Sequence, residues 1–327
     1  MPLFSVLIPA YKISYLEQAI NSVLRQNYKD FELIIVDDAS PENLTQVISK
    51  FNDCRIKYYR NDKNFGALNV VDNWNKCLFY ATGDYVLCMG DDDILCENCL
   101  EEYKKLIDKY PSLNVFHGRT EIINENSKFV RLTEARPEYE SVYSLIWHRW
   151  RNRSQYIGDL LFKKDSLVAK GGFYKLPLAW GSDDVTSYMM ALDYGIANTQ
   201  VPVFQYRQSN YTITNSGNVY SKLDAIQLEK KWIASFLENN NPTDELDIKY
   251  KNILLNDIPR VFNKKKIIVA LSEHLQFNSF SRYCSLCIHS KRNKLSLSLI
   301  TISYLLTLLT KIKRKHKNDL FNKSKLE

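Results

Sequence analysis

Residues Asp84–Leu95 read Asp-Tyr-Val-Leu-Cys-Met-Gly-Asp-Asp-Asp-Ile-Leu. The apolar run Tyr85–Met89 has the length and composition of a strand buried on both faces, and a Gly83-Asp84 turn signal precedes it. The strand ends in Asp91–Asp93, three carboxylates that repel one another at neutral pH. Such a cluster either binds a cation, accepts hydrogen bonds from backbone N–H groups, or is a solvated loop that caps the helix starting near Glu97. The surrounding segments must decide between these interpretations.

Strands and helices alternate on both sides of this stretch. The predicted strands are Phe4–Pro9, Phe31–Val36, Ile56–Arg60, Val115–Ile123, Ile157–Phe162 and Val201–Tyr206, and the predicted helices include Tyr15–Gln26, Asn43–Lys50 and Val70–Leu78. This alternation predicts an α/β fold with right-handed βαβ units and a mostly parallel sheet covered by helices on both faces. Ligands of such sheets bind beyond the carboxyl ends of the strands, so we expect the loops after Pro9, Val36 and Met89 to share one rim.

Three motifs on this rim resemble a known family. Ser5-Val-Leu-Ile-Pro-Ala-Tyr11, Leu33-Ile-Ile-Val-Asp-Asp-Ala-Ser40 and Gly83–Asp93 resemble, in order and spacing, the nucleotide-sugar half of the family 2 glycosyltransferases, which have a GT-A (Rossmann-like) fold. The resemblance implies a pyrimidine pocket in which Pro9, Ala10 and Tyr11 wall the base. It also implies that Asp38 accepts the imide hydrogen of the base while Asp37 helps to shape the loop, and an ionised carboxylate suits that role.

By the same resemblance, the acidic triplet Asp91–Asp93 corresponds to the metal-binding motif of the family. It implies that Asp92 is a metal ligand through the donor diphosphate, that Asp91 contacts the ribose or the metal, and that Asp93 orients the loop. Gly90 stands where some forms of this motif carry another Asp. Mg²⁺ or Mn²⁺ suits ligands that offer only oxygen.

A second candidate stretch is Ala179-Trp-Gly-Ser-Asp-Asp184, followed by a helix predicted to end at Tyr194-Gly195. Taken alone, it reads as a helix start with Ser182 as N-cap and two acids that the helix dipole favours by about 0.3–1 kcal/mol each. The resemblance implies instead an acceptor-side motif in which Asp184 is the catalytic base. Trp180 and Asp183 then lie on the acceptor side, with Asp183 where the family usually has Glu.

Arg207 follows the strand Val201–Tyr206. Many relatives carry a basic stretch here that meets the diphosphate, so the resemblance implies donor binding by Arg207; a structural salt bridge is the alternative. The resemblance extends over residues 3–210 and then stops. We therefore expect a GT-A domain in residues 1–214 and a helical C-terminal region in residues 215–327.

The basic charge of the chain is concentrated near its C-terminus. The formal net charge is +7, and residues 290–318 contain eight Lys or Arg and no acid, so the remainder is nearly neutral and a nucleic-acid-binding groove is not expected. Leu295–Ile312 is apolar, and as a helix it would span about 27 Å, just short of a bilayer core of about 30 Å. We expect peripheral membrane contact through residues 291–317, with Ser303 and Thr307 on the polar stripe. The alternatives are a helix packed on the catalytic domain and a true span.

Cysteine usage bears on the compartment. Seven cysteines and an N-terminus without a charged leader predict free thiols and a cytoplasmic protein, peripheral at the inner face of the membrane. The pairs Cys96/Cys99 and Cys284/Cys287 lie too far apart in sequence for a compact zinc ribbon.

These observations predict an inverting glycosyltransferase. It would move a hexose or N-acetylhexosamine from a nucleotide diphosphate sugar, with a UDP-sugar favoured, to a saccharide or lipid-linked saccharide acceptor in bacterial-type surface polysaccharide assembly (capsule, O-antigen or lipooligosaccharide). One alternative is a sugar-nucleotide nucleotidyltransferase, which should carry a Gly-rich basic loop after its first strand; Ala10–Ser14 is not such a loop. The other is a non-catalytic saccharide- or nucleotide-binding module on the same fold, distinguishable by whether the donor is consumed.

Overall fold

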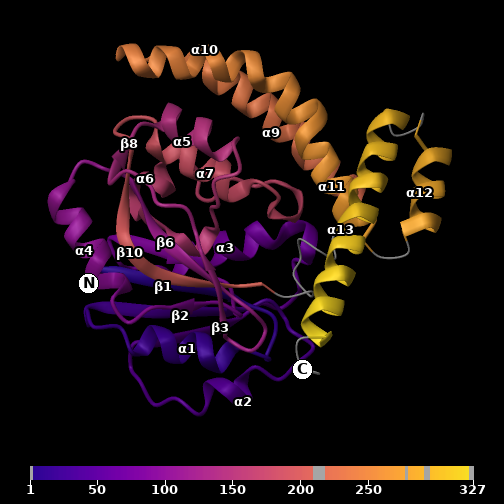
Figure 1. The fold of residues 1–327 in the computed structure, drawn as a ribbon. Coiled ribbons are helices and arrows are strands. Elements are labelled where there is room, and N and C mark those ends of the chain that lie inside the picture. Colours follow the sequence, from indigo (N-terminus) through magenta and orange to yellow (C-terminus); the bar gives the residue numbers. More distant parts are fainter. Residues whose placement is uncertain (1–2, 209–217, 277–278, 291–294, 324–327) are drawn as a thin grey trace.

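A mixed sheet forms the centre of the molecule (Figure 1). The computed structural model describes residues 3–208, 218–276, 279–290 and 295–323. The strand order is β3-β2-β1-β4-β9-β6-β10-β5, with β7 paired to β6 and β8 paired to β10. The strands are β1 Phe4–Ala10, β2 Phe31–Asp37, β3 Ile56–Arg60, β4 Tyr85–Cys88, β5 Ile94–Leu95, β6 Val115–Ile123, β7 Phe129–Leu132, β8 Tyr139–Glu140, β9 Leu160–Lys163 and β10 Ile196–Arg207.

Helices cover both faces of the sheet, as the sequence predicted. Alternate residues of β1 pack into two different cores: Val6 and Ile8 into one, Leu7 into the other. The first core includes residues of α1 Leu16–Leu24 and α4 Cys99–Lys109, and the second includes residues of α3 Val70–Tyr80, α5 Val142–Arg149 and α7 Ser182–Ala191. Shorter helices are α2 Thr45–Ile48 and α6 Lys164–Ala169, so the helix predicted over Asn43–Lys50 is reduced to one turn.

The carboxyl ends of three parallel strands meet at one rim. Strand β1 pairs in parallel with β2, from Phe4 opposite Phe31 to Ala10 opposite Asp37, and it pairs in parallel with β4 on its other side. The N–H of Asp38 donates to the carbonyl of Ala10 at 2.9 Å. The loops after Pro9, Val36 and Met89 therefore lie together, as predicted.

The other half of the sheet differs from a mostly parallel arrangement. The α/β class itself is confirmed, but β9 lies antiparallel between β4 and β6, while β10 runs parallel to β6. The chain leaves β6 at the rim and re-enters β9 from the same rim, and such a connection produces antiparallel strands. Ile157–Asp159, predicted as strand, forms a 3₁₀ turn before β9.

The C-terminal region consists of helices that share the second core. They are α9 Val219–Asn239, α10 Glu245–Arg260, the π-helical segment η4 Val261–Lys265, α11 Lys266–His274, α12 Ser279–Ile288 and α13 Leu297–Lys323. Buried residues of α9, η4, α11 and α13, such as Ile226, Phe262, Leu271 and Ile300, belong to the same core cluster as Leu7 and Val86 of the sheet. The expected boundary between residues 214 and 215 lies outside the described residues and stays a prediction.

Helix α13 packs along α11 (Figure 1). Its Ser303 and Thr307 are buried there, and the Thr307 hydroxyl donates to the carbonyl of Ser272 at 3.3 Å. The basic residues at 291–294, part of the expected membrane segment, lie outside the described residues. Among the helices that the structure describes, none combines the length and the hydropathy that crossing a bilayer requires.

Candidate active site

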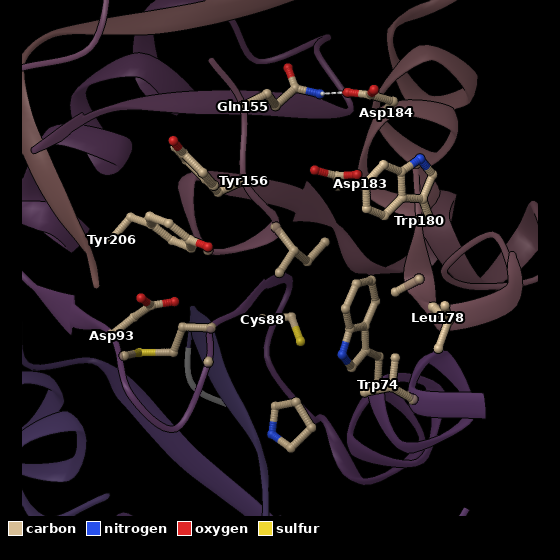
Figure 2. A pocket seen from close by; sticks show the side chains of 18 of the residues that line it. Trp74, Cys88, Asp93, Gln155, Tyr156, Leu178, Trp180, Asp183, Asp184 and Tyr206 are labelled. Carbon is tan, nitrogen blue, oxygen red and sulfur yellow. Dashed lines mark hydrogen bonds between the residues drawn. The ribbon is translucent and has the colours of Figure 1, made fainter. Parts of the chain in front are cut away.

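A cavity of about 770 Å³ lies at the carboxyl ends of β1, β2 and β4 (Figure 2). Nine of the ten residues predicted for the site line it: Pro9, Tyr11, Asp38, Asp91, Asp92, Trp180, Asp183, Asp184 and Arg207. The tenth, Ala10, is fully buried at the end of β1. Motifs as distant in sequence as Pro9 and Arg207 thus contribute to one cavity, although their individual chemical roles stay predictions.

The loop after β2 is held by its two aspartates in different ways. Asp37 is fully buried, accepts a 2.7 Å hydrogen bond from the Ser40 N–H, and pairs with Arg60. Asp38 faces the cavity and accepts hydrogen bonds from the Asn61 side chain and the Phe65 N–H, both at 3.0 Å. This geometry agrees with a loop-shaping role for Asp37 and leaves Asp38 as the carboxylate at the expected base pocket.

Asp91 connects the acidic loop to the loop after β1. Its Oδ2 accepts hydrogen bonds from the backbone N–H groups of Tyr11 and Lys12, both at 2.7 Å. Burial raises the pKa of Asp91 to about 6, and the charge of Asp92 contributes to the rise. The sequence predicted a ribose or metal contact for Asp91. It did not predict that one carboxylate oxygen of Asp91 is already hydrogen-bonded to the loop after β1.

Asp92 and Asp93 differ in what they face. The Asp92 carboxylate lines the cavity, is 19% exposed, and lies 4.0 Å from Lys12 Nζ. Asp93 accepts a 2.9 Å hydrogen bond from the Arg207 N–H, and burial followed by the charge of Asp92 raises its pKa well above the usual range. The arrangement is consistent with Asp93 as the residue that orients the loop and Asp92 as the one available to a ligand.

Arg207 is fully buried, and all three guanidinium nitrogens donate to protein oxygens. Nε donates to the Asp92 carbonyl at 2.7 Å, Nη1 to the Ser127 hydroxyl at 2.8 Å, and Nη2 to the Gln18 side chain at 3.0 Å. The guanidinium also stacks on the Tyr15 ring at 4.0 Å. These contacts favour a structural role, as in the alternative to donor binding, although they are hydrogen bonds and not a salt bridge. A diphosphate would reach the guanidinium of Arg207 only if these hydrogen bonds opened, and its role in donor binding stays a prediction.

Asp184 is held on the opposite wall of the cavity by partners from α5 and the segment after it. Arg149 Nε donates to Asp184 Oδ1 at 2.7 Å. Gln155 Nε2 donates to the same oxygen at 3.3 Å, as Figure 2 shows. Lys266 Nζ lies 3.9 Å from Asp184 Oδ2. Burial opposes the charged form of Arg149, but the charge of Asp184 raises the pKa of Arg149 above its ordinary value.

Asp183 points into the open part of the cavity beside Trp180 (Figure 2). Burial raises its pKa to about 7, and the neighbouring Asp184 carboxylate contributes to the rise. Gly181 starts this helix with a left-handed φ of 86°, and a Cβ there would lie 2.8 Å from Glu229 Oε2. Only glycine therefore fits the turn that presents Asp183 and Asp184.

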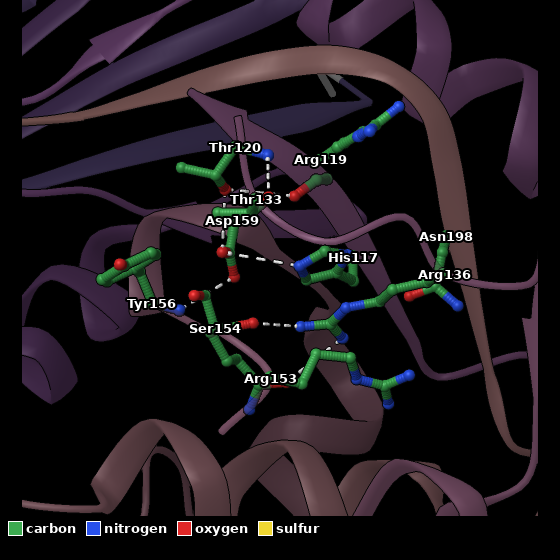
Figure 3. A network of polar contacts seen from close by, with 12 residues as sticks. His117, Arg119, Thr120, Thr133, Arg136, Arg153, Ser154, Tyr156, Asp159 and Asn198 are labelled. Atoms are coloured by element: carbon green, nitrogen blue, oxygen red, sulfur yellow. Dashed lines mark hydrogen bonds and ion pairs between the residues drawn. The ribbon is translucent and has the colours of Figure 1, made fainter. Parts of the chain in front are cut away.

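A buried polar network lies behind the cavity wall (Figure 3). Asp159 Oδ1 accepts from the Tyr156 N–H at 3.1 Å, and Asp159 Oδ2 accepts from the Thr120 hydroxyl at 2.9 Å. His117 Nε2 lies 3.5 Å from the same carboxylate, and Arg136 Nη2 donates to the Ser154 carbonyl at 2.6 Å. The network fixes the segment that carries Gln155 and Tyr156.

Sequence reasoning missed several cavity residues: Lys12, Arg149, Gln155, Tyr156, Tyr206, Lys265 and Lys266. Tyr156 and Tyr206 stack with ring centroids 4.0 Å apart. The aromatic and basic composition around Arg149 was the only available signal, because no spacing rule connects these residues to Asp184.

The acidic loop offers too few side-chain ligands to bind a divalent cation without a further ligand. In the parts of the chain that the structure describes, no group of three or more His, Cys, Asp or Glu side chains is placed to bind a metal unaided. Asp92 offers one hard oxygen donor group at the cavity surface, next to two further carboxylates. Such a donor set fits Mg²⁺ or Mn²⁺ that is shared with phosphate oxygens of a ligand.

The sheet and its acidic strand ends are those of the GT-A glycosyltransferases. The sequence model described as glycosyl transferase family 2 matches residues 5–173, and the chain belongs to this family. A similar curated protein is the UDP-Glc:alpha-D-GlcNAc-diphosphoundecaprenol beta-1,3-glucosyltransferase WfgD of Escherichia coli, 35% identical over 132 residues. That match covers 39% of this chain and 51% of the relative, so the chain spans about half the length of this relative.

Two solved structures have a similar fold. One is S. aureus TarS 1-349 in complex with UDP-GlcNAc, with a TM-score of 0.63, 16% identity, and coverage of 95% of this chain and 92% of that one. The other is the mannosyltransferase PcManGT from Pyrobaculum calidifontis in complex with GDP-Man and Mn²⁺, with a TM-score of 0.52, 17% identity, and coverage of 95% and 88%. At these identities the likeness establishes the fold alone.

Proposed function

We propose that this protein is a metal-dependent, inverting glycosyltransferase that moves a hexose or N-acetylhexosamine from a UDP-sugar to a saccharide acceptor in surface polysaccharide assembly. The observation that carries the proposal is that Asp92 and Asp184 line a single cavity whose volume, about 770 Å³, suits a nucleotide sugar and an acceptor end. One carboxylate faces the expected diphosphate and the other the expected acceptor hydroxyl.

Inversion requires one in-line displacement. The acceptor oxygen forms a bond to the anomeric carbon while the bond from that carbon to the diphosphate oxygen breaks, and Asp184 takes the proton of the attacking hydroxyl. Arg149 and Gln155 fix the Asp184 oxygen that they contact, which leaves its other oxygen toward Lys266 and the cavity. A bound divalent cation would stabilise the negative charge of the departing diphosphate, with Asp92 as its protein ligand.

The proposed donor rests on the base pocket and on the curated relative. Asp38, Pro9 and Tyr11 line this end of the cavity. The curated relative carries UDP-Glc in its name, which supports a uridine donor.

The acceptor is proposed to be linked to a lipid at a membrane surface. The relative's name includes a diphosphoundecaprenol acceptor. Helix α13 turns its buried Ser303 and Thr307 toward α11 and leaves a face of large exposed apolar side chains, namely Leu297, Ile302, Leu305, Leu306, Leu309 and Ile312. Such a face supports peripheral membrane contact. Packing on the protein and membrane contact are compatible here, because the helix packs by its polar stripe and presents its apolar side outward.

A donor screen scored by product tests the function and separates its rivals. Purified protein would be incubated with Mn²⁺, individual nucleotide sugars and a panel of saccharide acceptors. A glycosyltransferase releases nucleoside diphosphate in proportion to glycosylated acceptor. A nucleotidyltransferase would release or consume pyrophosphate, and a binding module would bind the donor without consuming it; either result would overturn the proposal.

A further inference from the structure

Five basic side chains surround the acceptor end of the cavity. Arg149, Lys265 and Lys266 line the cavity, and Arg151 and Arg260 lie close enough to Lys265 to affect its charge state. Burial lowers the pKa of Lys265, and the charges of Arg149, Arg260, Lys266 and Arg151 lower it further. The electrostatic potential at Lys265 is therefore positive before any ligand arrives.

The carboxylates nearby are matched to the other four basic side chains. Asp184 pairs with Arg149 at 2.7 Å, and Glu229 Oε2 pairs with Lys266 at 2.5 Å. Asp257 Oδ2 accepts from both Arg151 and Arg260, each at 2.9 Å. These three carboxylates pair with four of the five cations, which leaves one net positive charge on the Arg151–Arg260 pair and another on Lys265. Asp183 also lines the cavity, and burial raises its pKa to about 7.

The ammonium group of Lys265 has unused hydrogen-bond donors. Its Nζ donates to the Trp150 carbonyl at 2.6 Å, and within the described residues no carboxylate pairs with it. An ammonium group has three N–H donors, so two are available to a ligand in the cavity.

The backbone at this point has an uncommon form. Pro259 lies near the end of α10 and lacks the N–H that would continue the helix ladder, and the π-helical segment η4 Val261–Lys265 follows it. π-Helical turns are rare and frequently occur at functional sites. Here the segment ends at Lys265, and α11 begins at Lys266; both lysines line the cavity.

We propose that Lys265, assisted by Lys266, binds a phosphate group of the acceptor substrate. The proposal rests on the proposed function and narrows its acceptor to a phosphate or diphosphate ester of a saccharide. Phosphate oxygens accept charge-assisted hydrogen bonds from an ammonium group, and an anion balances the excess positive charge at this wall.

The position of Lys265 assigns the phosphate to the acceptor rather than to the donor. Lys266, the next residue, lies 3.9 Å from Asp184, the proposed base, whereas Lys12 is the lysine beside Asp92. Helix α11 begins at Lys266 and packs along α13, whose other face is apolar and exposed. A lipid-linked diphosphate would therefore have its saccharide at Asp184, its phosphates at Lys265 and its lipid near α13.

The test compares two acceptors that share one saccharide. One carries a diphosphate ester of a short soluble alkyl chain, and the other is the neutral methyl glycoside. Lys265→Gln should raise the KM for the diphosphate acceptor by about tenfold or more and leave the KM for the neutral one unchanged. Lys265→Arg should restore much of the affinity. Lys264→Gln is the matched control, because Lys264 is the exposed neighbour that does not line the cavity.

Calorimetry separates the sources of the phosphate and keeps the test independent of turnover. Binding of the diphosphate acceptor should weaken in Lys265→Gln, whereas binding of UDP with Mn²⁺ and flotation with phosphatidylglycerol vesicles should stay unchanged. Weaker UDP binding would assign Lys265 to the donor, and lost flotation would assign it to a lipid headgroup. Equal effects on both acceptors would overturn the proposal. If no donor is consumed, the proposed function fails, yet the difference in binding between the two acceptors still decides the role of Lys265.

Discussion

Arg149 and Asp184, 35 residues apart in sequence, are joined by a 2.7 Å hydrogen bond from Nε to Oδ1 at the wall of the cavity. Asp184 is only 3% exposed, so this charge pair is screened little by solvent. The pair fixes the Asp184 carboxylate where the acceptor hydroxyl is proposed to bind.

Asp184→Asn should lower kcat by roughly 10²–10⁴, the usual contribution of a general base, because an amide of the same shape cannot take the proton. The affinity for UDP with Mn²⁺ should change little, since Asp184 lies on the acceptor side. Turnover and calorimetric binding measured on the same preparation check this. A near-normal rate would reduce Asp184 to a first-turn acid that only stabilises its helix.

Asp183→Asn should change how stability depends on pH. In the unfolded chain an Asp titrates near pH 4, whereas in the folded protein its pKa is about 7. Between these values the folded state retains a proton that the unfolded state loses, so stability falls as pH rises from about 4 to about 7 and changes no further above that. Relative to the wild type, the variant should gain about 2–4 °C in Tm or more over this interval.

The measurement for Asp183 is a series of thermal melts of both proteins between pH 4 and pH 8 without added metal. Parallel Tm profiles would contradict the prediction. Activity provides a second readout, because a residue on the acceptor side should affect the acceptor KM more than the affinity for UDP.

Asp92→Asn should lose most metal-dependent activity, by roughly a hundredfold or more, while the thermal melt stays close to that of the wild type. The physical reason is that an amide oxygen is a weaker ligand than a carboxylate for a hard cation. Mn²⁺ titration of the rate checks the assignment, with chelator-treated wild type as the reference. Full activity of the variant at low Mn²⁺ would remove Asp92 from the metal site.

Asp38→Ala should weaken UDP binding by about 10–100-fold, the range for losing a charge-assisted hydrogen bond, before it affects kcat at saturating donor. Asp38 also accepts hydrogen bonds from Asn61 and Phe65, so a thermal melt must accompany the calorimetry. Asp38→Asn is the matched control, because it retains an acceptor oxygen without the charge. Unchanged UDP affinity in a folded Asp38→Ala protein would place the base elsewhere.

Replacing Leu305, Leu306 and Leu309 together by Ser should reduce binding to anionic vesicles by roughly tenfold or more while leaving Tm nearly unchanged. These side chains are 45–54% exposed, so they contribute little to the core. Val168→Ser removes a similarly exposed apolar side chain from α6 and serves as the control. Flotation that survives the triple change would argue against membrane contact through α13. Truncation is a poorer test, because Ile300 of the same helix is fully buried.

The sequence alone determined the nucleotide half of the fold. Apolar runs such as Leu33–Val36 and Tyr85–Met89, each followed by acids and separated by amphipathic helices, predict parallel strands whose carboxyl ends meet. These signals are local, because strand burial, helix periodicity and turn residues depend on neighbours within a few positions. The same is true of Asp183 and Asp184 as acids at the start of a helix.

Only the tertiary structure decided which side chains meet those acids. Arg149 donates a hydrogen bond to Asp184, and the guanidinium of Arg207 donates to Asp92, Ser127 and Gln18. These contacts arise from packing between elements that no sequence periodicity connects. The antiparallel insertion of β9 depends on where the chain re-enters the sheet. For α13, the pattern predicted an amphipathic helix, but its orientation follows from α11, against which the small polar Ser303 and Thr307 pack closely, so that the leucines are left outside.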